Sequence, residues 1–119
     1  MKLSSVGVPI AQRELSLSGA ANVSVLIGKP EVFPDGNGCY CPVQIVGLGE
    51  QRVSSPMGQD TMQALVLALE FVGTSLYTSS AWKSGRLTWL GNRNLGFPVP
   101  ESIRDLVPPF LHTSTPPQD

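Results

Sequence analysis

One stretch, residues 59–76 (QDTMQALVLALEFVGTSL), is the only part of the chain long and apolar enough to form a multi-turn helix. Asp60 or Thr61 can supply the side-chain oxygen that caps the first turn, and Gly73 weakens the far end. The sequence therefore predicts a helix over about residues 60–75, and the rest of the chain must be arranged around it.

At about 100° per residue this helix has two apolar faces. We expect the wider face to pack on the core, and it contains Met62, Leu65, Val66, Leu69, Val72 and Leu76. The second face lies nearly opposite and contains Ala64, Leu67 and Phe71, with a polar strip that includes Glu70 in between. A helix on a small sheet buries one face, so the second should be covered by the rest of the chain or by another molecule.

Length and charge limit what the chain can be. A chain of 119 residues builds one domain around a single core. Charged residues make up 14% of it, against roughly 25% in an average domain, and the net charge is −1 without a run of like charges. These values argue against a nucleic-acid footprint or a patch for anionic membranes, and a sparsely charged surface favours association with another protein.

Targeting signals are not visible in the sequence. The first fifteen residues lack the apolar run of a signal peptide, and the longest apolar stretch, residues 64–69, is far too short to span a bilayer. We therefore expect a cytoplasmic protein.

Alternating polar and apolar residues predict strands on both sides of the helix. Four are expected before it, at residues 13–18, 23–28, 41–46 and 52–55, and a fifth after it at residues 86–90. The turn-forming segments between them make antiparallel hairpins the simplest connection. The predicted fold class is α+β, an antiparallel four- to five-stranded meander with one long helix packed on it.

Proline content separates the two ends of the chain. Residues 1–98 are expected to form the single α+β domain, and residues 99–119 a Pro-rich C-terminal extension. One helical turn is possible at residues 101–106, and about the last seven residues are expected to be disordered.

Three segments of the chain follow one another in this order: IGKPEVFPDGNGCYCPVQIVGLGEQRV, QDTMQALVLALEFV and RLTWLGNRNLGFP. Together they resemble a family of small uncharacterised bacterial proteins that carry a domain of unknown function. The resemblance covers about residues 12–98. It implies this strand pattern, Gly-rich hairpin ends and a Trp-Leu-Gly element after the helix, and it supplies no catalytic residues.

The sequence contains few candidate residues for metal binding or nucleophilic catalysis. Cys39 and Cys41 share a strand face with Val43 and Ile45, and a zinc site needs more ligands than this pair. The only histidine, His112, lies in the Pro-rich tail. We expect buried, reduced thiols, no metal and no cofactor.

Other candidate groups have simpler interpretations. Asp60 and Glu70 lie about 15 Å apart along the helix, too far to act as a carboxylate pair. The Gly-Leu-Gly at residues 47–49 precedes a strand and lacks the Lys of a phosphate loop. The aromatic residues after the helix, including Phe97 and Phe110, are expected to cover its second face rather than to stack on bases or sugars.

Two hypotheses for function follow. The first is a non-enzymatic protein-binding module, for which a bacterial immunity or antitoxin-like protein is the concrete case. Its partner is another protein or a second copy, with no nucleic acid and no membrane involved. The candidate partner face consists of Ala64, Leu67, Phe71 and Trp89.

The alternative is a small-molecule-binding protein or an enzyme, with a pocket between the helix and the C-terminal segment. Its expected lining is Arg52 and Glu70 with Trp82 or Trp89. Convergence of Arg52 and Glu70 in one deep pocket would favour this alternative.

Overall fold

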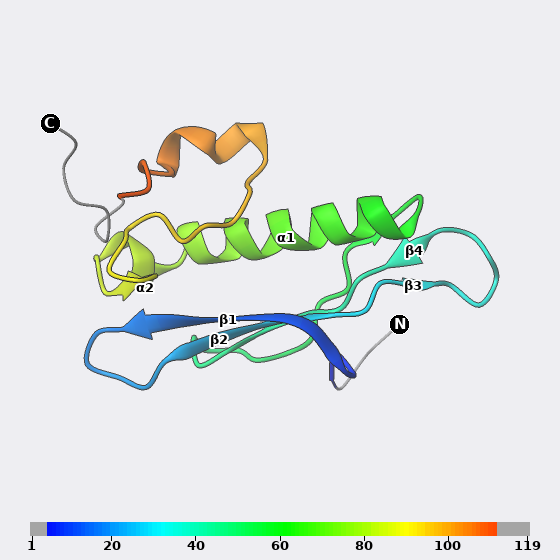
Figure 1. Ribbon diagram of the computed structural model, residues 1–119, viewed down its shortest axis with the longest axis horizontal. Coiled ribbons are helices and arrows are strands. Elements are labelled where there is room, and N and C mark those ends of the chain that lie inside the picture. Colours follow the sequence, from blue (N-terminus) through cyan, green and yellow to red (C-terminus); the bar gives the residue numbers. More distant parts are fainter. Residues whose placement is uncertain (1–4, 112–119) are drawn as a thin grey trace, which may run out of the picture.

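The computed structural model of the protein describes residues 5–111. A long helix, α1 (Thr61–Tyr77), lies across antiparallel strands (Figure 1). The strands are β1 (Pro9–Leu17), β2 (Val23–Gly28), β3 (Glu31–Val32), β4 (Cys39–Tyr40), β5 (Val43–Val46), β6 (Met57–Gly58) and β7 (Leu87–Thr88). Two short helices follow α1: α2 (Ser80–Lys83) and the 3-10 helix η1 (Glu101–Leu106). This α+β arrangement confirms the predicted fold class.

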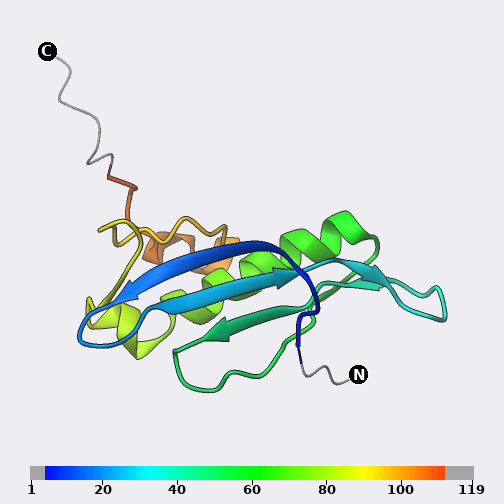
Figure 2. The ribbon, with the colours of Figure 1, turned by 60° about the horizontal axis from the view of Figure 1, so that its bottom comes forward.

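The strands form a four-stranded sheet in the order β5-β2-β1-β7 and a three-stranded sheet in the order β3-β4-β6. Pro30 separates β2 from β3, and Pro42 separates β4 from β5. Because proline has no backbone N–H, the hydrogen-bond ladder is interrupted at both positions. Gly28 N donates to the carbonyl oxygen of Pro42 at 2.8 Å and keeps the two chains together across the break. The segments β2–β3 and β4–β5 therefore form the two arms of one long, bent hairpin that runs through both sheets (Figure 2).

Not every predicted strand is as regular as expected. The predicted fourth strand, residues 52–55, is reduced to one bridge between Ser54 and Val43, and regular pairing resumes at β6. The fifth predicted strand shortens to β7, which pairs with β1 only at Ser16 and Leu17. The turn-forming residues 33–38 close a hairpin as expected, but the strands β3 and β4 that flank this turn were not predicted, because each has only two residues.

Helix α1 begins where the sequence indicates. Asp60 is the N-cap, and its Oδ1 accepts a hydrogen bond from Gln63 N at 2.8 Å. The expected end near residue 75 was too early, because the helix continues through Gly73 to Tyr77. An ideal Cβ on Gly73 would lie 2.5 Å from the carbonyl oxygen of Pro98. Gly73 therefore allows the C-terminal segment to pack closely against the helix and does not end it.

Replacing Gly73 with alanine tests this explanation. In an unobstructed helix this change stabilises by about 1 kcal/mol. Here the added methyl group would meet the Pro98 carbonyl and would also lie 2.9 Å from Val99 Cγ1. We expect a net loss of about 1–3 kcal/mol in the free energy of unfolding, measured by urea denaturation. Thr74→Ala is the neighbouring control and should change it by less than about 1 kcal/mol; a more stable Gly73→Ala protein would contradict the close approach.

The face of α1 that packs on the sheet differs from the prediction. The fully buried side chains on it are Ala64, Ala68, Val72 and Leu76. Met62 and Val66, which were expected in the core, are exposed, and Ala64 is buried instead. The reason lies at β6, where an ideal Cβ on Gly58 would be 2.5 Å from the backbone nitrogen of Ala64. Because the backbones approach this closely at β6, the small Ala64 faces the sheet there, and Met62 and Val66 are turned outward.

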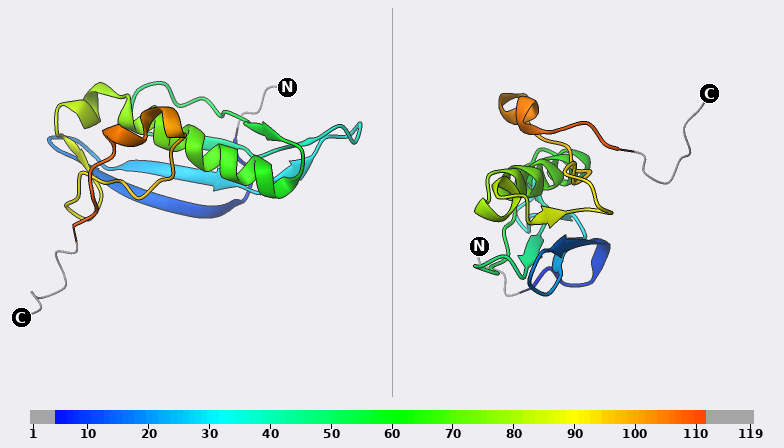
Figure 3. Two further views of the ribbon diagram at one scale, coloured as in Figure 1. Left: turned by 90° about the horizontal axis from the view of Figure 1, so that it is seen from above. Right: turned by 90° about the vertical axis from the view of Figure 1, so that its left-hand side faces the viewer.

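The C-terminal extension is docked as far as Leu111. The side chain of the buried Asn92 binds the backbone of Leu111 twice, accepting from its N–H at 2.6 Å and donating to its carbonyl oxygen at 3.1 Å. Asn94 Nδ2 donates to the carbonyl oxygen of Pro108 at 2.8 Å. The extension therefore lies over the C-terminal half of α1, on the side away from the sheet (Figure 1, Figure 3). The helical turn expected at residues 101–106 is η1, and the expected disorder at residues 113–119 lies outside the described residues.

The segment before β1 packs against the domain from residue 6 onward. Val6 is buried, and its carbonyl oxygen lies so close to Gly28 that an ideal Cβ there would be 2.4 Å away. Among residues 5–111, no helix is long and apolar enough to cross a membrane.

Candidate functional site

The first turns of α1 carry large apolar side chains that the described chain leaves in solvent. The exposed fractions are 72% for Met62, 45% for Val66, 37% for Leu67 and 41% for Phe71. We call these four exposed residues the bare helix face; Met62 and Val66 lie on one side of the polar strip that includes Glu70, and Leu67 and Phe71 on the other. The C-terminal extension passes over the other half of the helix and leaves this half uncovered (Figure 1). The bare helix face is thus an apolar surface on a rigid element.

The partner face expected from the sequence is only partly assembled. Leu67 and Phe71 are exposed as that hypothesis requires, whereas Ala64 is fully buried against the sheet and is not available to a partner. Trp89 lies in a different cluster, 5.7 Å from Phe110 between ring centroids. Sequence periodicity missed Met62 and Val66 because it placed them on the core side.

Phe71 lines a hollow on the β5 side of the helix. Arg52 lines the same hollow, and its Nη1 lies 3.5 Å from Glu50 Oε1 in an exposed ion pair. Trp82 belongs to α2 and is buried against Tyr77, 4.9 Å away between ring centroids. Glu70 is half-buried on α1. Arg52 and Trp82, two residues of the expected pocket, therefore do not lie together: Arg52 lines the hollow beside Phe71, and Trp82 is buried against Tyr77.

Arg13 organises the aromatic residues that follow α1. Its guanidinium carbon lies 3.7 Å from the centroid of the Trp89 ring and 4.8 Å from that of Phe97. Its Nη1 donates to the carbonyl oxygens of Leu95 and Gly96, each at 3.1 Å. Burial lowers the pKa of Arg13. The signal for this role was present in the sequence, because Arg13 has the same strand parity as Leu15, which is buried.

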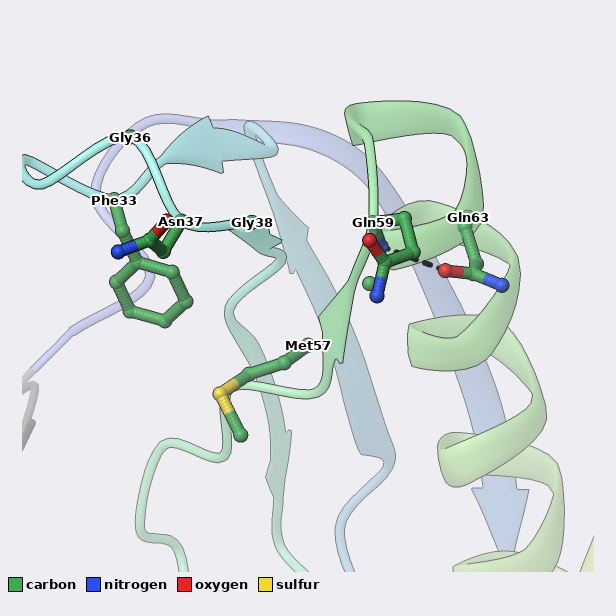
Figure 4. Close-up of a pocket in the computed structure, with 8 residues that line it drawn as sticks. Phe33, Gly36, Asn37, Gly38, Met57, Gln59 and Gln63 are labelled. Atoms are coloured by element: carbon green, nitrogen blue, oxygen red, sulfur yellow. Dashed lines mark hydrogen bonds between the residues drawn. The ribbon is translucent and has the colours of Figure 1, made fainter.

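A broad hollow of about 540 Å³ lies between the β3–β4 loop and the start of α1 (Figure 4). Its lining side chains are neutral, with Phe33 and Met57 on one wall and Gln59 and Gln63 on the other. Two backbone amides at the helix start already have partners, because Gln63 N donates to Asp60 Oδ1 and Gln59 N donates to Gln63 Oε1. The hollow therefore lacks the groups for acid–base chemistry or for holding a phosphate.

The cysteines are placed as structural residues. Cys39 and Cys41 are both buried and both free, and Cys41 Sγ donates to the carbonyl oxygen of Gly28 at 3.5 Å. Burial raises the pKa of the Cys41 thiol to about 11. Within residues 5–111, no group of three or more His, Cys, Asp or Glu side chains is arranged to hold a metal ion.

The raised pKa of Cys41 predicts a loss of stability in alkaline solution. An unfolded cysteine releases its proton near pH 8.5, whereas the folded protein keeps it until about pH 11. The unfolded state therefore binds fewer protons in this window, and the free energy of unfolding should fall as the pH rises through it. Melting temperatures from pH 7 to 11 should fall less steeply for Cys41→Ala than for the wild type. Parallel curves would show that Cys41 does not contribute.

Comparison with known proteins gives one match. No curated protein and no solved structure matches the chain significantly. Residues 11–99 match the family described as domain of unknown function DUF6968, in agreement with the resemblance expected over residues 12–98. The matched region runs from β1 to the buried Val99 and contains the sheet, the capped helix and the segment that packs on Gly73. The chain therefore belongs to the DUF6968 family.

Proposed function

We propose that the protein is a non-enzymatic protein-binding module and that the bare helix face docks on its partner. The observation that carries this proposal is the exposure of four large apolar side chains on one half of α1. Fully burying a side chain of this size is worth roughly 1.5–3 kcal/mol, so a partner that covers the face gains a substantial free energy. Larger exposed apolar surfaces of monomeric proteins are commonly interaction sites.

The charges near this face indicate the chemistry of the partner. Asp60 and Glu70 are the charged residues of the helix and its cap, and Arg52, which lines the hollow beside Phe71, is already paired with Glu50. A second copy would bring two acidic faces together, which is unfavourable. We therefore infer a different protein, with an apolar surface rimmed by basic residues. A cytoplasmic bacterial immunity or antitoxin-like protein that neutralises a toxin remains the concrete case.

A photo-crosslinking experiment tests the proposal. Benzoylphenylalanine is introduced at position 66 or 62 in cells that make the protein naturally, and at position 20 as an exposed control in the β1–β2 turn. We expect positions 62 and 66, but not 20, to capture one and the same basic protein. The purified pair should then bind with a measurable dissociation constant.

Two results would overturn the proposal. One is crosslinking from positions 62 and 66 to a second copy alone, which would make the face a dimer interface. The other is a captured protein that binds the Val66→Asp variant as tightly as the wild type.

A further inference from the structure

A second feature lies on the β1 side of the molecule, away from the Phe71 hollow. A cavity of about 180 Å³ opens between β1, α1 and the segment that follows β7. Its apolar lining consists of Ala11, Val25, Ile27, Leu69, Phe97 and Pro98. Because β7 pairs with β1 only at Ser16 and Leu17, no described strand closes the sheet beside Ala11. The cavity is therefore accessible from the open edge of β1.

Arg13 is the charged residue in the wall of this cavity. Its ring contacts with Trp89 and Phe97 use the face of the guanidinium group, and Nη1 is bound to two carbonyl oxygens. Within residues 5–111 the ion pairs are Lys29 with Glu31 and Arg52 with Glu50, so no carboxylate there neutralises Arg13. A partly buried cation beside apolar walls is a favourable site for an anion, because pairing offsets the cost of removing the charge from water.

We propose that this cavity binds a small monocarboxylate with an apolar tail. The carboxylate pairs with the N–H groups of Arg13 that do not bind residues 95 and 96, and the tail lies among Val25, Ile27 and Leu69. A guanidinium group is well suited to this role because its planar edge matches the two oxygens of a carboxylate. The proposal concerns other residues than the bare helix face and does not depend on it.

The volume limits the size of the tail. An apolar cavity of about 150 Å³ holds one benzene molecule, whereas pockets for larger ligands measure roughly 300–1,000 Å³. At about 180 Å³ the cavity fits one ring or one short branched chain. Such a carboxylate comes from a free small acid or from the C-terminal residue of a peptide lying along the open edge of β1.

Nuclear magnetic resonance titration of the full chain tests the proposal with benzoate and 3-methylbutanoate as ligands. We expect saturable shifts of the backbone amides of Ala11, Leu69 and Gly96 and of Arg13 Nε–Hε. Benzamide has nearly the same shape without the charge and should bind at least about tenfold more weakly, since hydrogen bonds to charged groups are the stronger ones. Absence of saturable shifts with either acid, or equal binding of benzamide, would overturn the proposal.

Two variants separate the cavity from the charge. Ala11→Leu fills the mouth of the cavity and keeps Arg13, so it should abolish the ligand-induced shifts. Ala20→Leu is the control: it makes the same change in an exposed turn and should leave the shifts unaltered. Arg13→Gln should also abolish binding. If Arg13→Gln does not fold, the Ala11 variant still decides, and unchanged binding by Ala11→Leu would refute the cavity as the site.

Peptides distinguish the two sources of the carboxylate. A short peptide ending in leucine is compared as the free acid and as the C-terminal amide. If the free acid binds more tightly than 3-methylbutanoate and also shifts the amides of Gln12 and Glu14, the natural ligand is a peptide C-terminus. If it binds no more tightly, the ligand is a free small acid. Both results support the carboxylate site, whereas equal binding of the acid and the amide contradicts it.

Discussion

Replacing Tyr77 with alanine should lower the free energy of unfolding by about 3–5 kcal/mol, the range found when large aromatic core residues are truncated. Tyr77 is fully buried at the end of α1 and meets Trp82 edge to face, with ring centroids 4.9 Å apart. Its hydroxyl accepts a hydrogen bond from Leu95 N at 2.7 Å. The side chain thus joins α1, α2 and the C-terminal segment, and its removal should loosen all three. A loss below about 1 kcal/mol in urea denaturation would contradict this role.

Tyr77→Phe isolates the hydrogen bond from the packing. It keeps the ring and leaves the buried Leu95 N–H without its partner, which should cost about 1–3 kcal/mol. Tyr40→Phe is the matched control, because Tyr40 is half-buried and its ring packs on Phe33, 4.9 Å away. The control should change stability by less than about 1 kcal/mol.

Substituting aspartate for Val66 or Phe71 should weaken binding to the proposed partner by about thirtyfold or more. This corresponds to the loss of at least 2 kcal/mol that defines a residue central to an interface. The isolated fold should remain nearly intact, because both side chains are already more than a third exposed. Binding is measured by titration calorimetry with the purified partner, and stability by thermal unfolding.

Val32→Asp is the control for this pair. Val32 is also an exposed valine, but it lies on β3, outside the bare helix face, so its substitution should leave affinity unchanged. A loss of more than about 3 kcal/mol of stability in Val66→Asp would show that Val66 belongs to the core. That outcome would remove the physical reason for a docking surface.

Local signals were sufficient to predict the elements. Asp60 and Thr61 were the two cap candidates from their side chains and position alone, and the bond from Gln63 N shows that Asp60 is the cap. Strand β2 was predicted with its observed bounds, because Val23, Val25 and Ile27 alternate on the buried face. Such features depend on neighbouring residues and are visible in one sequence.

Features that depend on distant residues could not be predicted in this way. Gly73 resembles a helix end until Pro98 is known to pack on it, and the rotation of α1 follows from the close approach of Gly58 to Ala64. Periodicity assigned Met62 to the core because it measures hydrophobicity and not how near another backbone lies. The same limit affected Arg13: its strand parity with the buried Leu15 was visible, but the carbonyl groups that it binds, those of Leu95 and Gly96, lie more than eighty positions away.

The most direct test of the bare helix face is the oxidation rate of Met62, the most exposed of its four residues. The purified, monomeric protein is treated with dilute hydrogen peroxide, and sulfoxide formation at Met62 is followed by peptide mass spectrometry. The same measurement is then made on the wild-type protein in its non-covalent complex with the partner that crosslinking identified. We predict rapid oxidation in the isolated protein and strong protection in the complex. Slow oxidation in the isolated monomer, or equal rates in both states, would contradict the claim that this face is free in the monomer and covered by a partner.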